Sequence, residues 1–227
     1  MTFGRMKVPV LIIAMVVVSL LYAQLLVAEE PVSEQLVVAA FSKGDLSGWS
    51  KKSFKGMTDY SIVQDGDRKV LRAISRNAAS GLVKKIVIDT SRYSILRWSW
   101  KIERTLKRED ATKKSGDDFV ARVYVIFPQA LFWKTRAINY VWSAKLPKGT
   151  AIPNAYSANA IMVAVESGDE KAGVWIDEER NIFEDYKRFF GEEPPRLGAV
   201  ALMSDTDNTG DEAIAYFGDI FLRTGNH

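Results

Sequence analysis

The segment 205–212 (DTDNTGDE) carries the most specific pattern of chemically capable residues in the sequence. Asp205, Asp207 and Thr209 place oxygen atoms at alternate positions just before Gly210, as in the first half of a calcium loop. The twelfth position of such a loop is Tyr216 and not the bidentate glutamate that an EF-hand requires, so an EF-hand is excluded. Two interpretations stay open, namely a calcium site of another kind at these three residues and a polar turn between two strands.

A second cluster of polar residues lies near the middle of the chain. In an extended strand Asp118, Arg122 and Tyr124 project from one face, because successive side chains alternate between the two faces. Such a face can bind a sugar or a carboxylated ligand, or it can hold an ion pair on an outer sheet surface. With the polar and aromatic residues of segment 139–142, the predicted ligand-binding cleft is lined by Asp118, Arg122, Tyr124, Asn139 and Trp142.

Few catalytic chemistries are available to this chain. It has no cysteine, and its one histidine is the last residue, His227. Nucleophilic catalysis by Ser-His or Cys-His, Cys/His zinc sites and haem ligation by histidine are therefore excluded. Carboxylates, Tyr, Lys, Arg, hydroxyl groups and a metal ion bound by oxygen remain, and glycoside hydrolysis needs two carboxylates. The candidates are Asp117, Asp118, Glu184 and Asp185, but the separation that matters is spatial, so no catalytic residue is assigned.

The N-terminus has the pattern of a targeting segment. Arg5 and Lys7 precede a mainly apolar run over residues 8–28, which is typical of a secretory signal with cleavage after Ala23 or Ala28. The run also approaches the length that spans a bilayer, so residues 1–28 are either a signal peptide or an N-terminal anchor. Both interpretations predict export, to the periplasm or to the periplasmic side of the inner membrane, with the N-terminal segment as the only membrane contact.

Charge gives little indication of a partner. The chain of 227 residues has 31 Lys and Arg against 28 Asp and Glu. Removal of residues 1–28 takes away Arg5 and Lys7, which leaves 29 against 28, a net charge of +1. This balance and the predicted export argue against nucleic acid as a partner.

Short segments of period two dominate the chain after a polar lead-in at residues 29–36. Residues 96–102 and 119–127 alternate in this way, and residues 60–64 and 69–74 flank the turn Asp65-Gly66-Asp67, a hairpin signal. Nine or ten such strands predict a mainly β protein, a jelly-roll-like sandwich over residues 37–227. Trp98 and Trp100 are expected in its core. One amphipathic helix is expected at residues 177–190, capped by Asp177 and ended by Gly191.

Several segments together resemble a family of exported bacterial proteins of unknown function, the domain of unknown function 3047. They are 115–122 (SGDDFVAR), 139–142 (NYVW), 180–186 (RNIFEDY), 190–195 (FGEEPP) and 203–210 (MSDTDNTG). The family implies no activity. The segments 41–49 and 216–222 are also similar to the first and last strands of jelly-roll carbohydrate-binding modules. In such modules an acidic residue of the last strand, here Asp219, often helps to hold a structural calcium ion.

These observations favour non-catalytic binding of a glycan or another cell-envelope ligand, with calcium as the one candidate cofactor. The first alternative is a carboxylate-based carbohydrate-active enzyme, a hydrolase or a lyase. The second is a structural envelope protein that binds other proteins, which would present a large exposed apolar patch.

Overall fold

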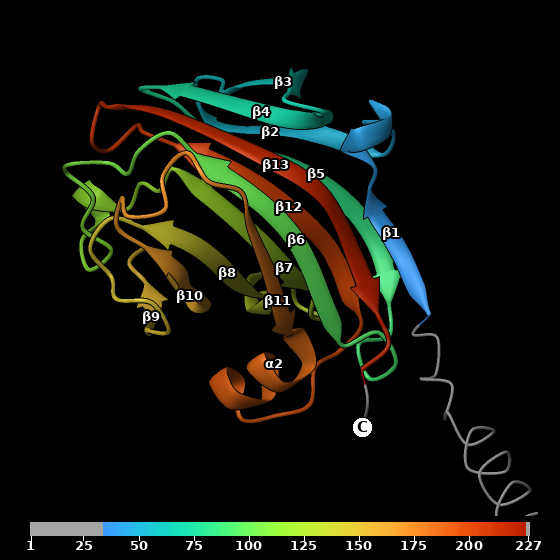
Figure 1. Ribbon diagram of the computed structural model, residues 1–227. Coiled ribbons are helices and arrows are strands. Elements are labelled where there is room, and N and C mark those ends of the chain that lie inside the picture. Colours follow the sequence, from blue (N-terminus) through green and yellow to red (C-terminus); the bar gives the residue numbers. More distant parts are fainter. Residues whose placement is uncertain (1–33, 226–227) are drawn as a thin grey trace, which may run out of the picture. The chain divides into compact units, whose positions relative to one another are not determined.

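The computed structural model describes residues 34–225, which form two facing β-sheets (Figure 1). One sheet has six strands in the order β11-β6-β13-β4-β3, with β1 also paired to β13. The other has seven strands in the order β2-β5-β12-β7-β8-β10-β9. Every pairing is antiparallel except that of β8 with β10. The predicted mainly β sandwich is therefore confirmed.

Most strands follow one another with short connections, and the longest connection, residues 103–120, joins β6 to β7. The bounds are β1 Gln35–Ala39, β2 Trp49–Lys55, β3 Asp59–Asp65, β4 Arg68–Arg76, β5 Ala79–Ile88, β6 Ile95–Ile102, β7 Ala121–Phe127, β8 Arg136–Ser143, β9 Ala151–Asn154, β10 Ser157–Ser167, β11 Ile176–Asn181, β12 Leu197–Asp205 and β13 Glu212–Arg223. The hairpin of β3 and β4 turns at Gly66, whose φ of 61° suits glycine. Neither β2 nor β9 is predicted as a strand from the sequence, because the lysine-rich β2 and the four-residue β9 lack a clear alternation of apolar residues.

Aromatic side chains fill the space between the sheets. Trp98 stacks on Tyr140 with ring centroids 5.4 Å apart, and Trp100 lies 5.8 Å from Trp142. All four are buried, which confirms Trp98 and Trp100 as core residues. The two tryptophans come from β6 and the other pair from β8, so these contacts join the two sheets across the sandwich.

The predicted helix begins later than expected. Residues 176–181 form β11, in which Asp177 pairs in register with Ser99 of β6, and only Ile182–Phe190 is helical (α2). Asn181 is the actual N-cap, because its side chain accepts a hydrogen bond from the Glu184 backbone N–H at 3.1 Å. Asp177 is therefore not the cap. The end at Gly191 is confirmed by its left-handed conformation.

Register in the seven-stranded sheet decides which side chains face outward. Tyr124 pairs with Asn139 on β8 and with Ala201 on β12, so these three share one face. The alternate residues Val123 and Tyr140 pair with each other on the opposite face, which is buried in the core. Arg122, Tyr124 and Asn139 thus lie on the outer surface of this sheet.

The first strand begins at Gln35, so it includes the last two residues of the predicted lead-in over residues 29–36. The predicted signal or anchor at residues 1–28 lies outside the described residues. Within residues 34–225, no helix has the length and apolar character needed to cross a bilayer.

Candidate functional site

A cavity of about 420 Å³ opens on the outer face of the seven-stranded sheet. All seven strands, or the turns next to them, contribute to it. The lining residues are Phe54, Ala79, Asp117, Arg122, Tyr124, Asn139, Asn154, Tyr156, Ala160, Met203, Asp205, Asp207 and Asn208. Arg122, Tyr124 and Asn139 of the predicted cleft therefore meet in one cavity of the size that holds small ligands.

Arg122 anchors the floor of this cavity. Its Nε and Nη2 donate to the two carboxylate oxygens of Asp205 at 2.8 and 2.5 Å, a bidentate pair in which both side chains are almost fully buried. Nη2 also donates to the Asp117 backbone carbonyl, and Nη1 to the Tyr124 hydroxyl at 3.3 Å. Burial opposes the charge of Arg122, but Asp205, Tyr124 and Asp117 outweigh it and raise its pKa.

Asp117 lies beside this pair, and only one of its two carboxylate oxygens accepts a hydrogen bond from the described residues. Its Oδ2 accepts from Asn154 Nδ2 at 2.9 Å. Its Oδ1 is buried without a hydrogen-bond partner among the described residues, and Arg122 Nη1 is 3.7 Å away. Burial raises the pKa of Asp117, whereas Arg122 and Asn154 act to lower it.

Asp118 is fully buried beneath the cavity and does not line it. Its carboxylate accepts from the backbone N–H groups of Asn208 and Thr209, at 3.0 and 2.6 Å, and from Asn208 Nδ2. Asp118 therefore holds the β12–β13 turn in place. The expectation that it lines the cleft is wrong, because it precedes β7 and the alternation of that strand does not extend to it.

Trp142 is also misplaced in the predicted cleft. It is fully buried between the sheets, where Nε1 donates to the Gly168 carbonyl at 2.9 Å. Asn139 and Trp142 are three positions apart on one strand, so they point to opposite faces. The exposed tryptophan is Trp133, in the β7–β8 loop and not among the cavity residues.

The structure supplies other aromatic groups at this site. Phe54 on β2 and Tyr156 between β9 and β10 line the cavity, and their exposed fractions are 67% and 55%. The Tyr156 hydroxyl lies 2.9 Å from Asn208 Oδ1. Neither residue was predicted from the sequence. The one available signal was a Phe in the otherwise polar segment 50–56.

The predicted calcium residues lie where the turn meets the cavity. Asp118, Asp205 and Asp207 offer carboxylate oxygens that lie within 4.8 Å of one another. Asp205 is already paired with Arg122, and Asp118 already accepts three N–H donors. Thr209 is buried, and its Oγ1 has no hydrogen-bond partner among the described residues. Calcium at Asp205, Asp207 and Thr209 stays a prediction.

The catalytic candidates fall into two separate groups. Asp117 and Asp118 lie at or beneath the outer-face cavity. Asp185 on α2 is buried against Tyr140, whose side chain belongs to the inner face of the same sheet. Glu184 is exposed on the helix and pairs with Lys187 at 3.9 Å. The two groups contact opposite faces of the sheet, so the proposed pairing of Asp117 or Asp118 with Glu184 or Asp185 is not formed.

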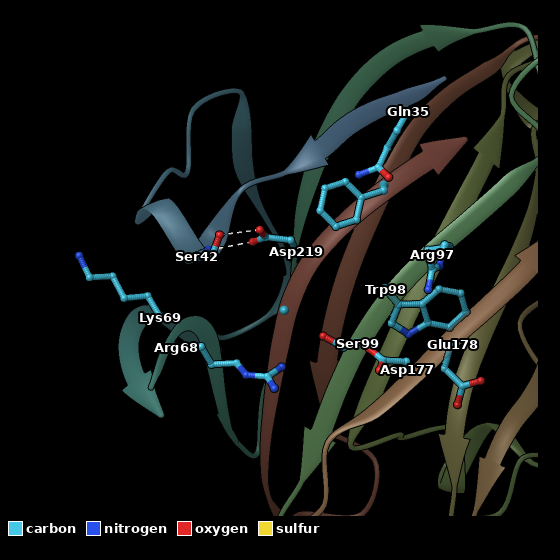
Figure 2. Close-up of a pocket in the computed structure, with 12 residues that line it drawn as sticks. Gln35, Ser42, Arg68, Lys69, Arg97, Trp98, Ser99, Asp177, Glu178 and Asp219 are labelled. Carbon is cyan, nitrogen blue, oxygen red and sulfur yellow. Dashed lines mark hydrogen bonds between the residues drawn. The ribbon is translucent and has the colours of Figure 1, made fainter. Parts of the chain in front are cut away.

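A second cavity, of about 390 Å³, lies on the six-stranded sheet where β13 bulges away from β6 (Figure 2). Asp219 is directed toward Ser42 in this view, and its two oxygens accept from the Ser42 N–H and hydroxyl at 2.8 and 2.6 Å. Arg97, also in the lining, pairs with Glu179 at 3.2 Å. Asp219 and Arg97 of this cavity are thus already held by a hydrogen-bonded serine and by an ion pair.

Comparisons with solved structures return other β-sandwiches. A family 30 carbohydrate-binding module of a cellulosomal cellulase of Clostridium thermocellum is 10% identical, with a TM-score of 0.46 over 86% of this chain and 99% of that one. A Caldicellulosiruptor saccharolyticus carbohydrate-binding module, solved with mannohexaose, is 12% identical, with a TM-score of 0.44 and coverages of 86% and 99%. The adhesin domain of Lys-gingipain from Porphyromonas gingivalis is 10% identical, with a TM-score of 0.39 and coverages of 83% and 100%.

At these identities the likeness concerns the fold alone. A search of curated proteins found no match. The model of a family described as protein of unknown function (DUF3047) matches residues 47–221, which include all of the seven-stranded sheet, the six-stranded sheet except β1 and the end of β13, and every residue of the outer-face cavity. This chain therefore belongs to the DUF3047 family.

Proposed function

We propose that this protein is a binding domain that holds a glycan in the outer-face cavity, without catalysing its conversion. The observation that carries the proposal is the composition of the cavity wall. Buried polar side chains of Asp117, Arg122 and Asn139 lie beside the exposed rings of Phe54 and Tyr156. Sugar rings present an apolar face and a rim of hydroxyl groups, and this wall offers partners for both.

The rigidity of the site supports binding. Arg122 is held by Asp205, and Asn154 is held by Asp117, so the polar groups are positioned before a ligand arrives. Such preorganisation lowers the ordering cost of binding. The predicted N-terminal targeting segment places the ligand, in this proposal, among the glycans of the bacterial envelope.

A glycan-array screen of the full chain, followed by titration calorimetry on the best ligand, tests the proposal. We expect Phe54→Ala and Tyr156→Ala each to weaken binding about tenfold, which corresponds to about 1.4 kcal/mol. Phe132→Ala is the matched control, because Phe132 is 81% exposed and does not line the cavity.

Absence of any bound glycan would overturn the proposal. An equal loss of affinity in the Phe132 variant would also contradict it, since the contact would then lie outside the cavity. The array is run with calcium and with a chelator, so that a requirement for the predicted ion appears in the same experiment.

A further inference from the structure

Two residues that line the outer-face cavity carry buried acceptors without a hydrogen-bond partner among the described residues, whereas most side-chain donors of the lining bond to the protein itself. Asp117 Oδ1 and Asn139 Oδ1 are buried and have no hydrogen-bond partner among the described residues. Asn139 is 1% exposed, and both residues line the cavity. A buried acceptor without a donor is costly, so a ligand that donates hydrogen bonds would relieve both.

The donors of the wall point to groups of the protein itself. Arg122 makes four hydrogen bonds, to both Asp205 oxygens, the Asp117 carbonyl and the Tyr124 hydroxyl. Asn154 Nδ2 donates to Asp117 Oδ2 at 2.9 Å. Four of the five N–H groups of the cavity's guanidinium are therefore committed, and its Nη1 also lies 3.7 Å from Asp117 Oδ1, so an anionic ligand would compete with groups of the protein for it.

The charge of the lining has the same sign as these acceptors. Asp117, Asp205 and Asp207 contribute three carboxyl groups and Arg122 one positive charge, which gives −2 when all are ionised. Lys55 is the cation next to Asp207, with Nζ 3.9 Å from Asp207 Oδ2.

Resting on the proposed function, we infer that the glycan recognised here is an amino sugar whose protonated primary amine binds at Asp117, with Asn139 Oδ1 as a second acceptor. An ammonium group offers three donors and one positive charge, which matches the unsatisfied acceptors and the net charge of the wall. The exposed rings of Phe54 and Tyr156 would contact the apolar face of the same sugar. A uronic acid would place its carboxylate beside three aspartates with no free arginine.

Titration calorimetry on the full chain can test this inference with three pentasaccharides in a buffer that contains a chelator. The probes are pentaglucosamine, penta-N-acetylglucosamine and pentagalacturonate, at a pH that keeps the free amine protonated. We expect pentaglucosamine to bind at least fivefold more tightly than its N-acetylated form, and pentagalacturonate not to bind.

Asp117→Asn should remove this preference, because the amide keeps the shape of the carboxylate and loses its charge. Asp67→Asn, in the exposed β3–β4 turn of the other sheet, is the matched control and should keep the preference. Circular dichroism and the melting temperature show whether each variant is folded. Should the Asp117 variant not fold, Asn139→Ala replaces it, with an expected loss of affinity for pentaglucosamine.

The failures of the two proposals are distinguishable. Equal affinity for the free and acetylated sugars, or tighter binding of pentagalacturonate, would overturn the amino-sugar inference and leave glycan binding intact. Failure of every glycan on the array would overturn the proposed function, and this inference with it.

Discussion

Two arginine–carboxylate pairs occupy different environments in this sandwich. Arg122 and Asp205 lie under the outer-face cavity, with side chains 3% and 4% exposed. Arg180 and Asp185 join the end of β11 to α2, with side chains 31% and 8% exposed.

The two pairs differ in their neighbours. The Asp185 carboxylate accepts from Arg180 through both oxygens and from the Tyr140 hydroxyl at 2.8 Å. Next to Arg122, by contrast, Asp117 lines a cavity and its Oδ1 has no hydrogen-bond partner among the described residues. The Arg180–Asp185 pair thus links β11 to α2, whereas the Arg122–Asp205 pair lines a polar cavity. Unsatisfied neighbours beside a cavity, more than the pair itself, indicate a binding site.

The largest effect is expected when the cavity pair is broken. Arg122→Met leaves Asp205 buried without its positive partner, and the free energy of unfolding should fall by about 3–5 kcal/mol. Urea denaturation followed by circular dichroism measures the change. Arg122→Met combined with Asp205→Asn should recover part of the loss. A change below about 1 kcal/mol in the single variant would show that Asp205 is not held as the structure indicates.

A smaller effect is expected at the helix junction. Asp185→Asn removes the charge opposite Arg180, which solvent can partly stabilise, so the loss in unfolding free energy should be about 1–3 kcal/mol. The neighbouring Glu184→Gln is the control and should stay within about 0.5 kcal/mol, because Glu184 is exposed. If Asp185→Asn lowers the free energy of unfolding more than Arg122→Met does, the conclusion that the cavity pair is the more strongly coupled of the two is wrong.

Glu178 is a partly buried carboxyl group that has no arginine partner in the described part of the chain, so its effect on stability should depend on pH, unlike that of the two paired aspartates. Burial raises the pKa of Glu178 to about 7, and Oε1 has no hydrogen-bond partner among the described residues. The folded protein therefore binds a proton that the unfolded chain releases above its ordinary pKa of 4.5. The contribution of Glu178 to stability is present at low pH and is lost as the pH rises through about 7.

Glu178→Gln removes this dependence. Its melting temperature should exceed that of the unaltered protein by about 2–4 °C at pH 8 and match it at about pH 4, below the ordinary pKa of Glu178. Thermal unfolding across this pH range measures the difference. A gap that is constant with pH would contradict the assignment to Glu178.

The alternation of residues along the strands predicted part of the site, and two of the five predicted cleft residues, Trp142 and Asp118, were placed wrongly. Period two placed Arg122 and Tyr124 on one face, and the structure agrees. The same rule applied to β8 separates Asn139 from Trp142, so the burial of Trp142 was predictable from spacing. The burial of Asp118 was not predictable from spacing, because this residue precedes β7 and its carboxylate binds the N–H groups of the β12–β13 turn.

The sequence by itself determined the mainly β class, the Asp65-Gly66-Asp67 hairpin and the aromatic core, because these depend on local periodicity and turn chemistry. Tertiary structure decided the composition of the cavity. Phe54, Tyr156 and Asn139 come from β2, the β9–β10 turn and β8, and only the folded seven-stranded sheet brings them to one cavity. It also decided where α2 begins, because pairing with β6 keeps residues 176–181 extended until the Asn181 cap. Contacts between distant segments depend on packing, and no local pattern in one sequence specifies them.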